Sequence, residues 1–127
     1  MSNTTFTATI SEASRELTPY EMVKFKDTSN AMKIDDITQE EEKIVIAPKG
    51  YVVLDIHNEK SDNPDYKNFI IFDGLGTKYV TGSQSFWNNF ISIWEDMKDF
   101  NEEWEIELLR KPSKNFKGKD FITCALV

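Results

Sequence analysis

The chain has 127 residues and a formal net charge of -7, from 22 acidic and 15 basic side chains. This length suits one domain with a single core, and the excess of acids argues against a generally basic, non-specific binder of duplex DNA. No apolar run approaches the roughly 20 residues that span a bilayer, and the first residues lack the charged start and apolar middle of a signal peptide. We therefore expect a cytoplasmic protein without a membrane segment.

The first part of the chain predicts an arm followed by a short helix. Residues 1–16 are rich in Ser and Thr, and we expect a flexible arm or a segment added to a sheet edge. Thr18 can cap a helix that has Pro19 at its first position and Glu21 completing a T-x-x-E capping box. This helix is expected to end near Lys26. Residues 17–127 are expected to form one domain, in which the acidic stretch 31–42 reads as a solvated linker.

Strand patterns begin at Lys43. The β-branched and aromatic runs 44–46 and 51–56 predict either two strands or one long strand broken by a bulge near Gly50. Residues 66–72 predict the next strand, and the turn chemistry of 73–76 predicts a hairpin into another strand at 77–81.

The second half predicts one long helix and two further strands. Ser83 is a candidate cap, and Phe86, Phe90, Ile93 and Met97 recur on one helical face, which we interpret as a core stripe. Residues 104–109 alternate apolar and acidic side chains, as a half-buried strand does. Residues 120–127 are almost continuously apolar, which predicts a central or well-covered last strand that buries Cys124 as an inert structural thiol.

This order of elements predicts a mainly β fold. Three strands, a helix and two strands are the order of the oligonucleotide/oligosaccharide-binding (OB) fold, a five-stranded, partly open Greek-key barrel. In that fold the second and third strands, with the loops joining strands one to two and four to five, line the ligand groove. Those loops would be residues 58–65 and 110–119. An α+β sheet with one packed helix remains an alternative.

The stretch RKPSKNFKGK at 110–119 is the main candidate for binding. It holds five cations and no acid in an acidic chain, and cations interleaved with an aromatic ring suit single-stranded nucleic acid. A solvated hairpin loop has the same composition, so both interpretations stay open. Alternation places Tyr66 and Phe69 on opposite faces of their strand, so at most one of them can face a groove. The candidate nucleic-acid-binding residues are Arg110, Lys111, Lys114, Phe116, Lys117, Lys119, Tyr66, Phe69, Lys78 and Tyr79.

Two segments carry a resemblance. IHNEKSDNPDYKNFIIFDGLGTKYVTGSQSFW and RKPSKNFKGKDFITC look like small proteins of phages, prophages and integrative elements of Gram-positive bacteria, some of them described as single-stranded DNA-binding proteins. The resemblance covers roughly residues 17–127 and contains no diagnostic motif. It implies an OB-like fold and a role in DNA replication or recombination of a mobile element, with single-stranded DNA and phage or host replication and recombination proteins as partners. Homo-oligomerisation is compatible with such a role.

No catalytic, metal or cofactor site is expected. The lone His57, with Asp55 on its face, is more simply a hydrogen-bonded residue at a strand end than half of an acid–base pair, and a single histidine cannot build a multi-histidine metal site. The alternative function is an acidic protein-interaction module that engages a host or phage factor without binding nucleic acid. Its candidate surface is residues 95–107, where seven carboxylates surround the single cation Lys98.

Overall fold

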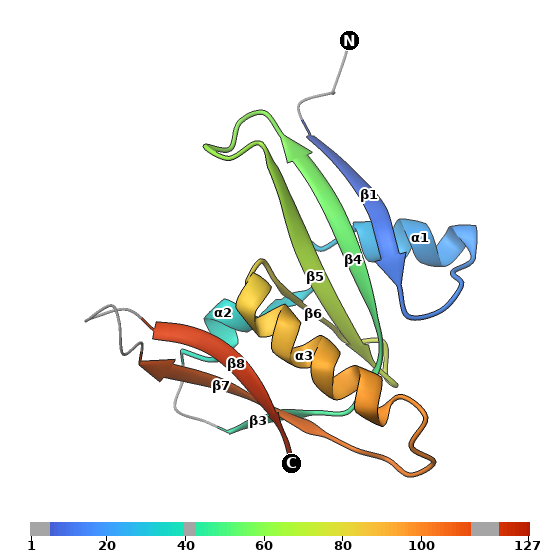
Figure 1. Ribbon diagram of the computed structural model, residues 1–127. Helices are drawn as coiled ribbons and strands as arrows, with labels where there is room; N and C mark the ends of the chain where they lie inside the picture. Colours follow the sequence, from blue (N-terminus) through green and yellow to red (C-terminus); the bar gives the residue numbers. More distant parts are fainter. Residues whose placement is uncertain (1–5, 40–42, 113–119) are drawn as a thin grey trace.

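The protein is described by a computed structural model that covers residues 6–39, 43–112 and 120–127 (Figure 1). Strands outnumber helices in the described parts of the chain, so the prediction of a mainly β fold is confirmed. In chain order the elements are β1 (Phe6–Ala13), α1 (Pro19–Lys26), β2 (Met32–Lys33), α2 (Ile34–Ile37), β3 (Ile44–Ile46), β4 (Pro48–Asn58), β5 (Asp65–Asp73), β6 (Lys78–Thr81), α3 (Gln84–Met97), β7 (Ile106–Pro112) and β8 (Asp120–Leu126).

The strands form two open sheets. The larger sheet has the order β1-β4-β5-β6-β2 and the smaller one β3-β7-β8. All described neighbours are antiparallel except β2 and β6, which run parallel. The second neighbour of β6 is therefore β2, and β8 pairs only with β7 among the described strands. The two sheets are linked directly by the chain between β3 and β4.

That link resolves the first strand signal of the sequence. The run 44–56 forms two strands that belong to different sheets, and a bulge between Pro48 and Gly50 bends the start of β4. A Cβ atom at Gly50 would lie 2.3 Å from Cζ of Phe72 and 2.6 Å from Oγ of Ser14. Glycine is required here because the backbone passes directly over an aromatic ring.

Three segments differ from the expected elements or refine them. Residues 6–13 form the edge strand β1, and the stretch interpreted as an acidic linker contains β2 and α2. The last strand was expected to be central or well covered; among the described strands β8 lies at the edge of its sheet, so it is not central, and α3 covers one of its faces. Ile122 and Cys124 are buried, whereas Phe121 and Leu126 are exposed. The apolar run 120–127 thus buries the side chains on one face of β8, while those on the other face lie at the surface.

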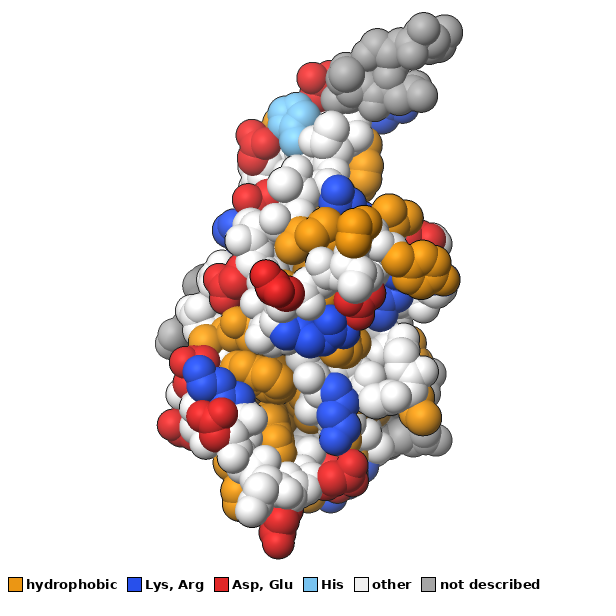
Figure 2. Space-filling view, turned by 90° about the vertical axis from the view of Figure 1, so that its right-hand side faces the viewer, with side chains coloured by type: hydrophobic (Ala, Val, Ile, Leu, Met, Phe, Trp, Pro, Cys, Tyr) orange, Lys and Arg blue, Asp and Glu red, His pale blue; other side chains and the backbone are white. Residues whose placement is uncertain are grey.

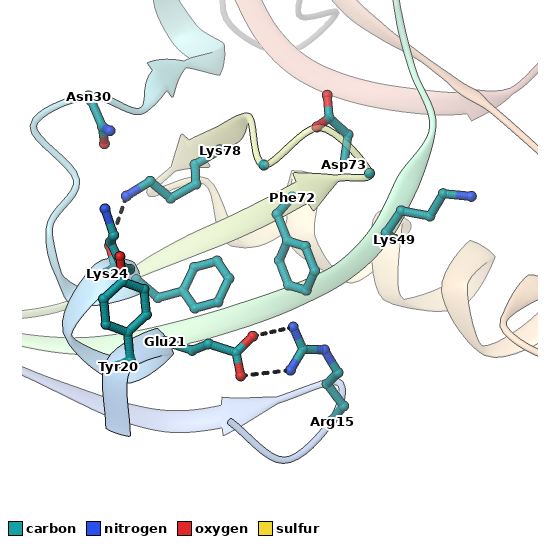
Figure 3. A pocket seen from close by; sticks show the side chains of 12 residues that line it. Arg15, Tyr20, Glu21, Lys24, Asn30, Lys49, Phe72, Asp73 and Lys78 are labelled. Atoms are coloured by element: carbon teal, nitrogen blue, oxygen red, sulfur yellow. Dashed lines mark hydrogen bonds and ion pairs between the residues drawn. The ribbon is translucent and has the colours of Figure 1, made fainter. Parts of the chain in front are cut away.

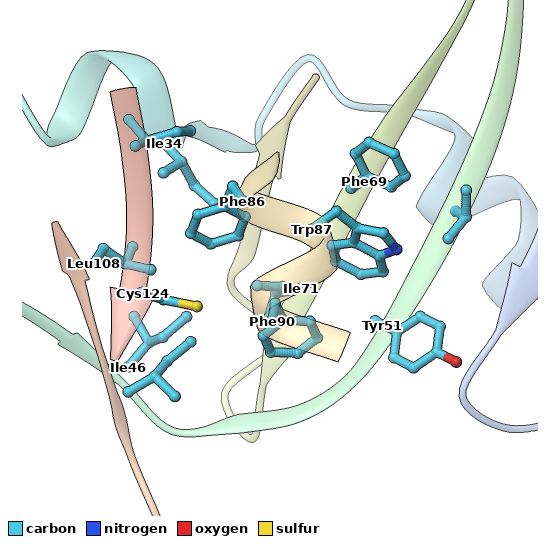
Figure 4. Packing of buried hydrophobic residues seen from close by; sticks show 13 residues of the cluster. Ile34, Ile46, Tyr51, Phe69, Ile71, Phe86, Trp87, Phe90, Leu108 and Cys124 are labelled. Carbon is cyan, nitrogen blue, oxygen red and sulfur yellow. The ribbon is translucent and has the colours of Figure 1, made fainter. Parts of the chain in front are cut away.

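Helix α3 packs between the two sheets and organises the larger core. Ser83 caps it as expected, with its side chain accepting a hydrogen bond from the Phe86 N–H. Phe86 and Phe90 are fully buried, and Trp87 stacks on Phe69 of β5 with ring centroids 4.8 Å apart (Figure 4). Ile46 and Leu108 of the smaller sheet join the same cluster. The aromatic stripe of the helix is therefore core, as the sequence predicts.

A second apolar cluster lies on the opposite face of the larger sheet. It contains Val52, Leu54 and Ile56 of β4 with Ile70 and Phe72 of β5. Its cover is helix α1, whose Phe25 packs against Phe72 at 4.9 Å between ring centroids. The centre of the larger sheet is thus covered on both faces.

Within the described residues, no helix is both long and apolar enough to cross a membrane.

Candidate nucleic-acid interface

A cleft of about 530 Å³ lies between helix α1, the β5–β6 hairpin and the start of β4 (Figure 3). We call it the α1 cleft. Its walls combine aromatic rings, four cations and only two carboxylates, in a chain whose net charge is -7. Its lining residues are Arg15, Tyr20, Glu21, Lys24, Phe25, Asn30, Lys49, Phe72, Asp73, Gly74, Gly76 and Lys78.

The start of α1 is fixed by its cap and by an ion pair. The capping box expected from the sequence is present, because the Thr18 side chain accepts from the Glu21 N–H and the Glu21 carboxylate accepts from the Thr18 N–H. The Arg15 guanidinium donates to both carboxylate oxygens of Glu21, at 3.1 and 2.6 Å. These bonds lower the pKa of Glu21 to about 2. Arg15 also lies over the Phe72 ring, 5.6 Å from its centroid.

The end of α1 is held by a buried lysine. Lys78 of β6 donates from Nζ to the backbone carbonyls of Lys24 and Asp27, at 2.8 and 2.6 Å. These are the carbonyl groups that a helix leaves without partners at its C terminus. Burial lowers the pKa of Lys78, since the charged form is desolvated. Lys78 therefore fastens the helix to the sheet, and its charge faces backbone oxygens.

The opposite wall of the α1 cleft is a tight hairpin. The Asp73 carboxylate accepts hydrogen bonds from the N–H groups of Leu75 and Thr77, both at 2.9 Å. Gly76 has a φ of +85°, a conformation that favours glycine. Leu75 at the tip is 92% exposed. The turn is thus ordered by its own side chain and keeps the wall in place.

Two cations of the α1 cleft can turn toward a ligand. Lys24 is exposed and lies 5.5 Å from the centroid of the Tyr20 ring, and Tyr20 itself is 71% exposed. Lys49 makes an exposed ion pair with Glu103 at 3.2 Å, which a stronger anion can replace. Figure 2, which views this side of the molecule, shows Lys and Arg side chains beside hydrophobic ones and a hollow below them. A ligand with negative charge and a flat ring would match both features.

Of the cations in the predicted basic stretch, Arg110 and Lys111 lie within the described residues. Arg110 donates from Nη2 to the Asp35 carbonyl at 2.6 Å, and its Nη1 lies 3.9 Å from the Asp120 carboxylate. The first contact ties β7 to α2, and the second joins it to the start of β8. Lys111 is exposed. The other predicted contacts, Lys114, Phe116, Lys117 and Lys119, lie outside the described residues.

The candidates on β5 and β6 lie on different faces of the larger sheet. Phe69 is 3% exposed and stacked on Trp87, so it is a core residue and not a stacking platform. Tyr66 packs against the apolar cluster under α1 and Tyr79 against the core around α3, and each is only partly buried. Tyr66 and Phe69 thus occupy opposite faces, as alternation predicts. Lys78 lines the α1 cleft, but its charge is committed to the end of α1.

His57 lies at the far end of β4 from the α1 cleft. Its Nδ1 is 2.7 Å from the Asp65 carboxylate and its Nε2 is 3.6 Å from that of Glu59. The hydrogen bond with Asp65 raises the pKa of His57. His57 is thus a hydrogen-bonded residue at a strand end, as expected, and the less favoured acid–base pair with Asp55 does not form, because Asp55 pairs with Lys67. Within the described ranges, no group of three or more His, Cys, Asp or Glu side chains could hold a metal ion.

The α1 cleft was missed by reasoning from sequence. The segment PYEMVKFK was interpreted only as a capped helix, although its side chains at positions 20, 22 and 23 are exposed and apolar and stand among lysines. That excess of exposed apolar side chains on a short helix was the available signal. Comparisons of the chain with protein-family models, curated proteins and solved structures give no match.

Proposed function

We propose that the protein binds single-stranded DNA of a phage or mobile element, in replication or recombination, and that the α1 cleft is part of its binding surface. The observation that carries this proposal is the gathering of four cations, against two carboxylates, beside the exposed Tyr20 ring in the α1 cleft of an acidic protein. Phosphates would meet Lys24 and Lys49, while a base would stack on Tyr20. The exposed Lys111 and the basic stretch that follows it would extend the contacts to the strand.

The pairing of strands supports this proposal. If β3 and β4 are taken as one broken first strand, then β5, β6, β7 and β8 are strands two to five of an OB-like fold, with α3 between strands three and four. The ligand face of an OB fold lies on its second and third strands. Phe72 of β5 and Lys78 of β6 line the α1 cleft from those two strands. Helix α1 covers the rest of the face, so a ligand would meet the sheet at its hairpin end.

The expected energetics follow from the chemistry of the α1 cleft. A base stacked on an aromatic side chain contributes about 1 to 3 kcal/mol. If about four phosphates are neutralised, the slope of log affinity against log salt should be roughly -3 for a single strand. Binding should favour oligo-dT over duplex DNA, because the stacking surface requires unpaired bases.

The test is fluorescence anisotropy with labelled oligo-dT over a series of salt concentrations. Tyr20→Ala should weaken binding about fivefold or more, whereas Val23→Ala should not change it. Val23 is the matched control, since it lies on the same helix and is 70% exposed compared with 71% for Tyr20. Tyr20→Phe should bind as the original chain does. Equal affinities for the Tyr20→Ala and Val23→Ala variants would remove the stacking role.

The cations are tested in the same assay. Lys24→Gln should flatten the salt slope by about 0.7, as expected for one lost phosphate contact. Lys67→Gln is the control, because Lys67 is exposed on β5 and pairs with Asp55 outside the α1 cleft. Absence of any binding at about 50 mM salt would contradict the proposal. That result would favour the second candidate function, an acidic protein-interaction module.

A specific observation supports that second candidate. The chain between residues 95 and 107 presents carboxylates that are mostly exposed, and Phe100 within this stretch is 48% exposed. An apolar side chain among surface acids is typical of a protein contact rather than a nucleic-acid contact. The acidic module therefore remains a separate hypothesis for this region.

A further inference from the structure

A second cleft opens on the side of α3 where the chain turns toward β7. We call it the Trp cleft, and its volume is about 280 Å³. Two tryptophans lie side by side there, since the rings of Trp94 on α3 and Trp104 in the segment before β7 have centroids 5.9 Å apart and planes tilted by 55°. Its lining residues are Pro48, Lys49, Trp94, Lys98, Phe100, Asn101, Glu102, Glu103 and Trp104.

The aromatic walls of the Trp cleft are held in place by the core beneath them. Trp94 packs edge-on against Tyr51 at 5.7 Å and lies 6.1 Å from Phe90, which is fully buried. The turn after α3 is closed by backbone hydrogen bonds from the Lys98 N–H to the Trp94 carbonyl and from the Phe100 N–H to the Met97 carbonyl. Rings held in this way lose little conformational freedom when a ligand binds.

The Trp cleft lies in the acidic stretch 95–107, although its own lining holds two lysines and two glutamates. Its two cations are already paired, Lys49 with Glu103 at 3.2 Å and Lys98 with Glu95 at 3.3 Å. Four further carboxylates of this stretch are exposed and make no ion pair among the described residues; they are Asp96, Asp99, Glu102 and Glu105. Such a surface repels a phosphate backbone and attracts cations.

We propose that the Trp cleft binds an extended segment of a partner protein in which proline alternates with lysine or arginine. Proline rings and lysine stems pack well on flat indole faces, and a proline-rich segment is already extended before it binds. The ammonium or guanidinium groups would meet the surrounding carboxylates, with a cation–π contribution from the tryptophans. The volume of about 280 Å³ suits a few side chains of a longer peptide rather than a whole small-molecule ligand.

The test is anisotropy of a labelled peptide of alternating proline and lysine, titrated with the full chain. We expect saturable binding that weakens with salt, and no binding of the matched proline–glutamate peptide. A proline–serine peptide should bind more weakly than the lysine peptide, since it keeps the proline rings but loses the charge. Lack of saturation with the lysine peptide, or equal binding of the glutamate peptide, would overturn the proposal.

Variants locate the binding site. Phe100→Ala should weaken peptide binding about fivefold, whereas Leu75→Ala should not, because Leu75 is exposed at the tip of the β5–β6 hairpin. Glu102→Gln should weaken it about twofold, and Asp62→Asn, in the β4–β5 loop, should leave it unchanged. These residues are exposed, so the variants should retain the fold, which circular dichroism can check. An unchanged affinity in Phe100→Ala would place the peptide elsewhere.

The experiment is independent of DNA binding. Peptide binding would stand if the α1 cleft failed to bind oligo-dT, and the reverse also holds. Lys49 lines both clefts and is therefore left intact in this series. A decisive contrary result is that oligo-dT competes with the peptide in the original chain but not in the Phe100→Ala variant. That result would mean that the Trp cleft binds nucleic acid, and it would overturn the proposal.

Discussion

The two faces of the larger sheet are covered in different ways. On one face, α3 and the smaller sheet enclose a core in which Phe86 and Phe90 have no exposed surface. On the other face, the eight-residue helix α1 covers a smaller cluster mainly through Phe25, and the α1 cleft remains at its side. The first face therefore supplies most of the stability, and the second leaves aromatic and basic groups accessible.

The covers also differ in what fixes them. Helix α3 is an amphipathic helix of 14 residues whose apolar face is buried between two sheets. Helix α1 is held by its capping box, the Arg15–Glu21 pair and the Lys78 hydrogen bonds, all at its ends. Polar contacts at helix ends position a cover without much apolar burial. This arrangement allows a binding cleft beside α1 without weakening the main core.

The largest difference between the two covers is expected when one phenylalanine is removed from each. Phe90→Ala should destabilise the fold by about 3 to 5 kcal/mol, because its cavity lies among rigid neighbours. Phe25→Ala should cost less, since Phe25 is 9% exposed and its short helix can settle onto the sheet. Urea unfolding of both variants gives the two free energies. A larger loss from Phe25→Ala would reverse the assignment of the main core.

A smaller loss of stability is expected from a substitution at Gly50, where β4 passes over Phe72. Gly50→Ala should destabilise the fold by about 1 to 3 kcal/mol, because the new Cβ would overlap the Phe72 ring and force it to move. Gly74→Ala is the control, as its nearest neighbour would be the flexible Lys49 side chain at 3.5 Å. The same unfolding measurement applies. Equal stability of the two variants would mean that Phe72 can move without cost, and that the α1 side packs loosely.

The smallest effect is expected at His57, which lies outside both covers. The pKa of His57 is raised above its ordinary value of 6.5, first by the hydrogen bond with Asp65. Its contribution to stability is therefore fully present below the unfolded pKa of 6.5 and is lost as the pH rises through the folded value. His57→Gln should lower the melting temperature at about pH 6 and change it less at about pH 9. A larger loss at the higher pH would contradict this sign.

Local signals in the sequence predicted local structure well. The starts of α1 and α3 were predicted from single caps, Thr18 and Ser83, because a cap acts within three residues of chain. The hairpin at Asp73 was predicted for the same reason. The position of β8 was not, since an apolar run does not reveal whether one or two of its faces are covered.

The candidate site was predicted only in part. The sequence indicated the basic stretch 110–119, and of its cations only Arg110 and Lys111 lie within the described residues. It also suggested Phe69 and Lys78, which turned out to be a core ring and a lysine bound to helix carbonyls. A residue type states what a side chain can do, whereas its partners, which come from distant segments, decide whether it is free to do so. The residues that line the α1 cleft come from segments spread between positions 15 and 78 of the chain.

The mainly β character, the capped helices α1 and α3, the hairpin and the aromatic stripe of α3 can be predicted from sequence alone, because each depends on propensity and periodicity within a few residues. The entry of β3 and β4 into different sheets, the position of α1 on one face of the larger sheet, and the choice of cations that remain at the surface emerge only on folding. These features depend on contacts between segments far apart in the chain, such as Phe25 with Phe72 and Lys78 with Lys24.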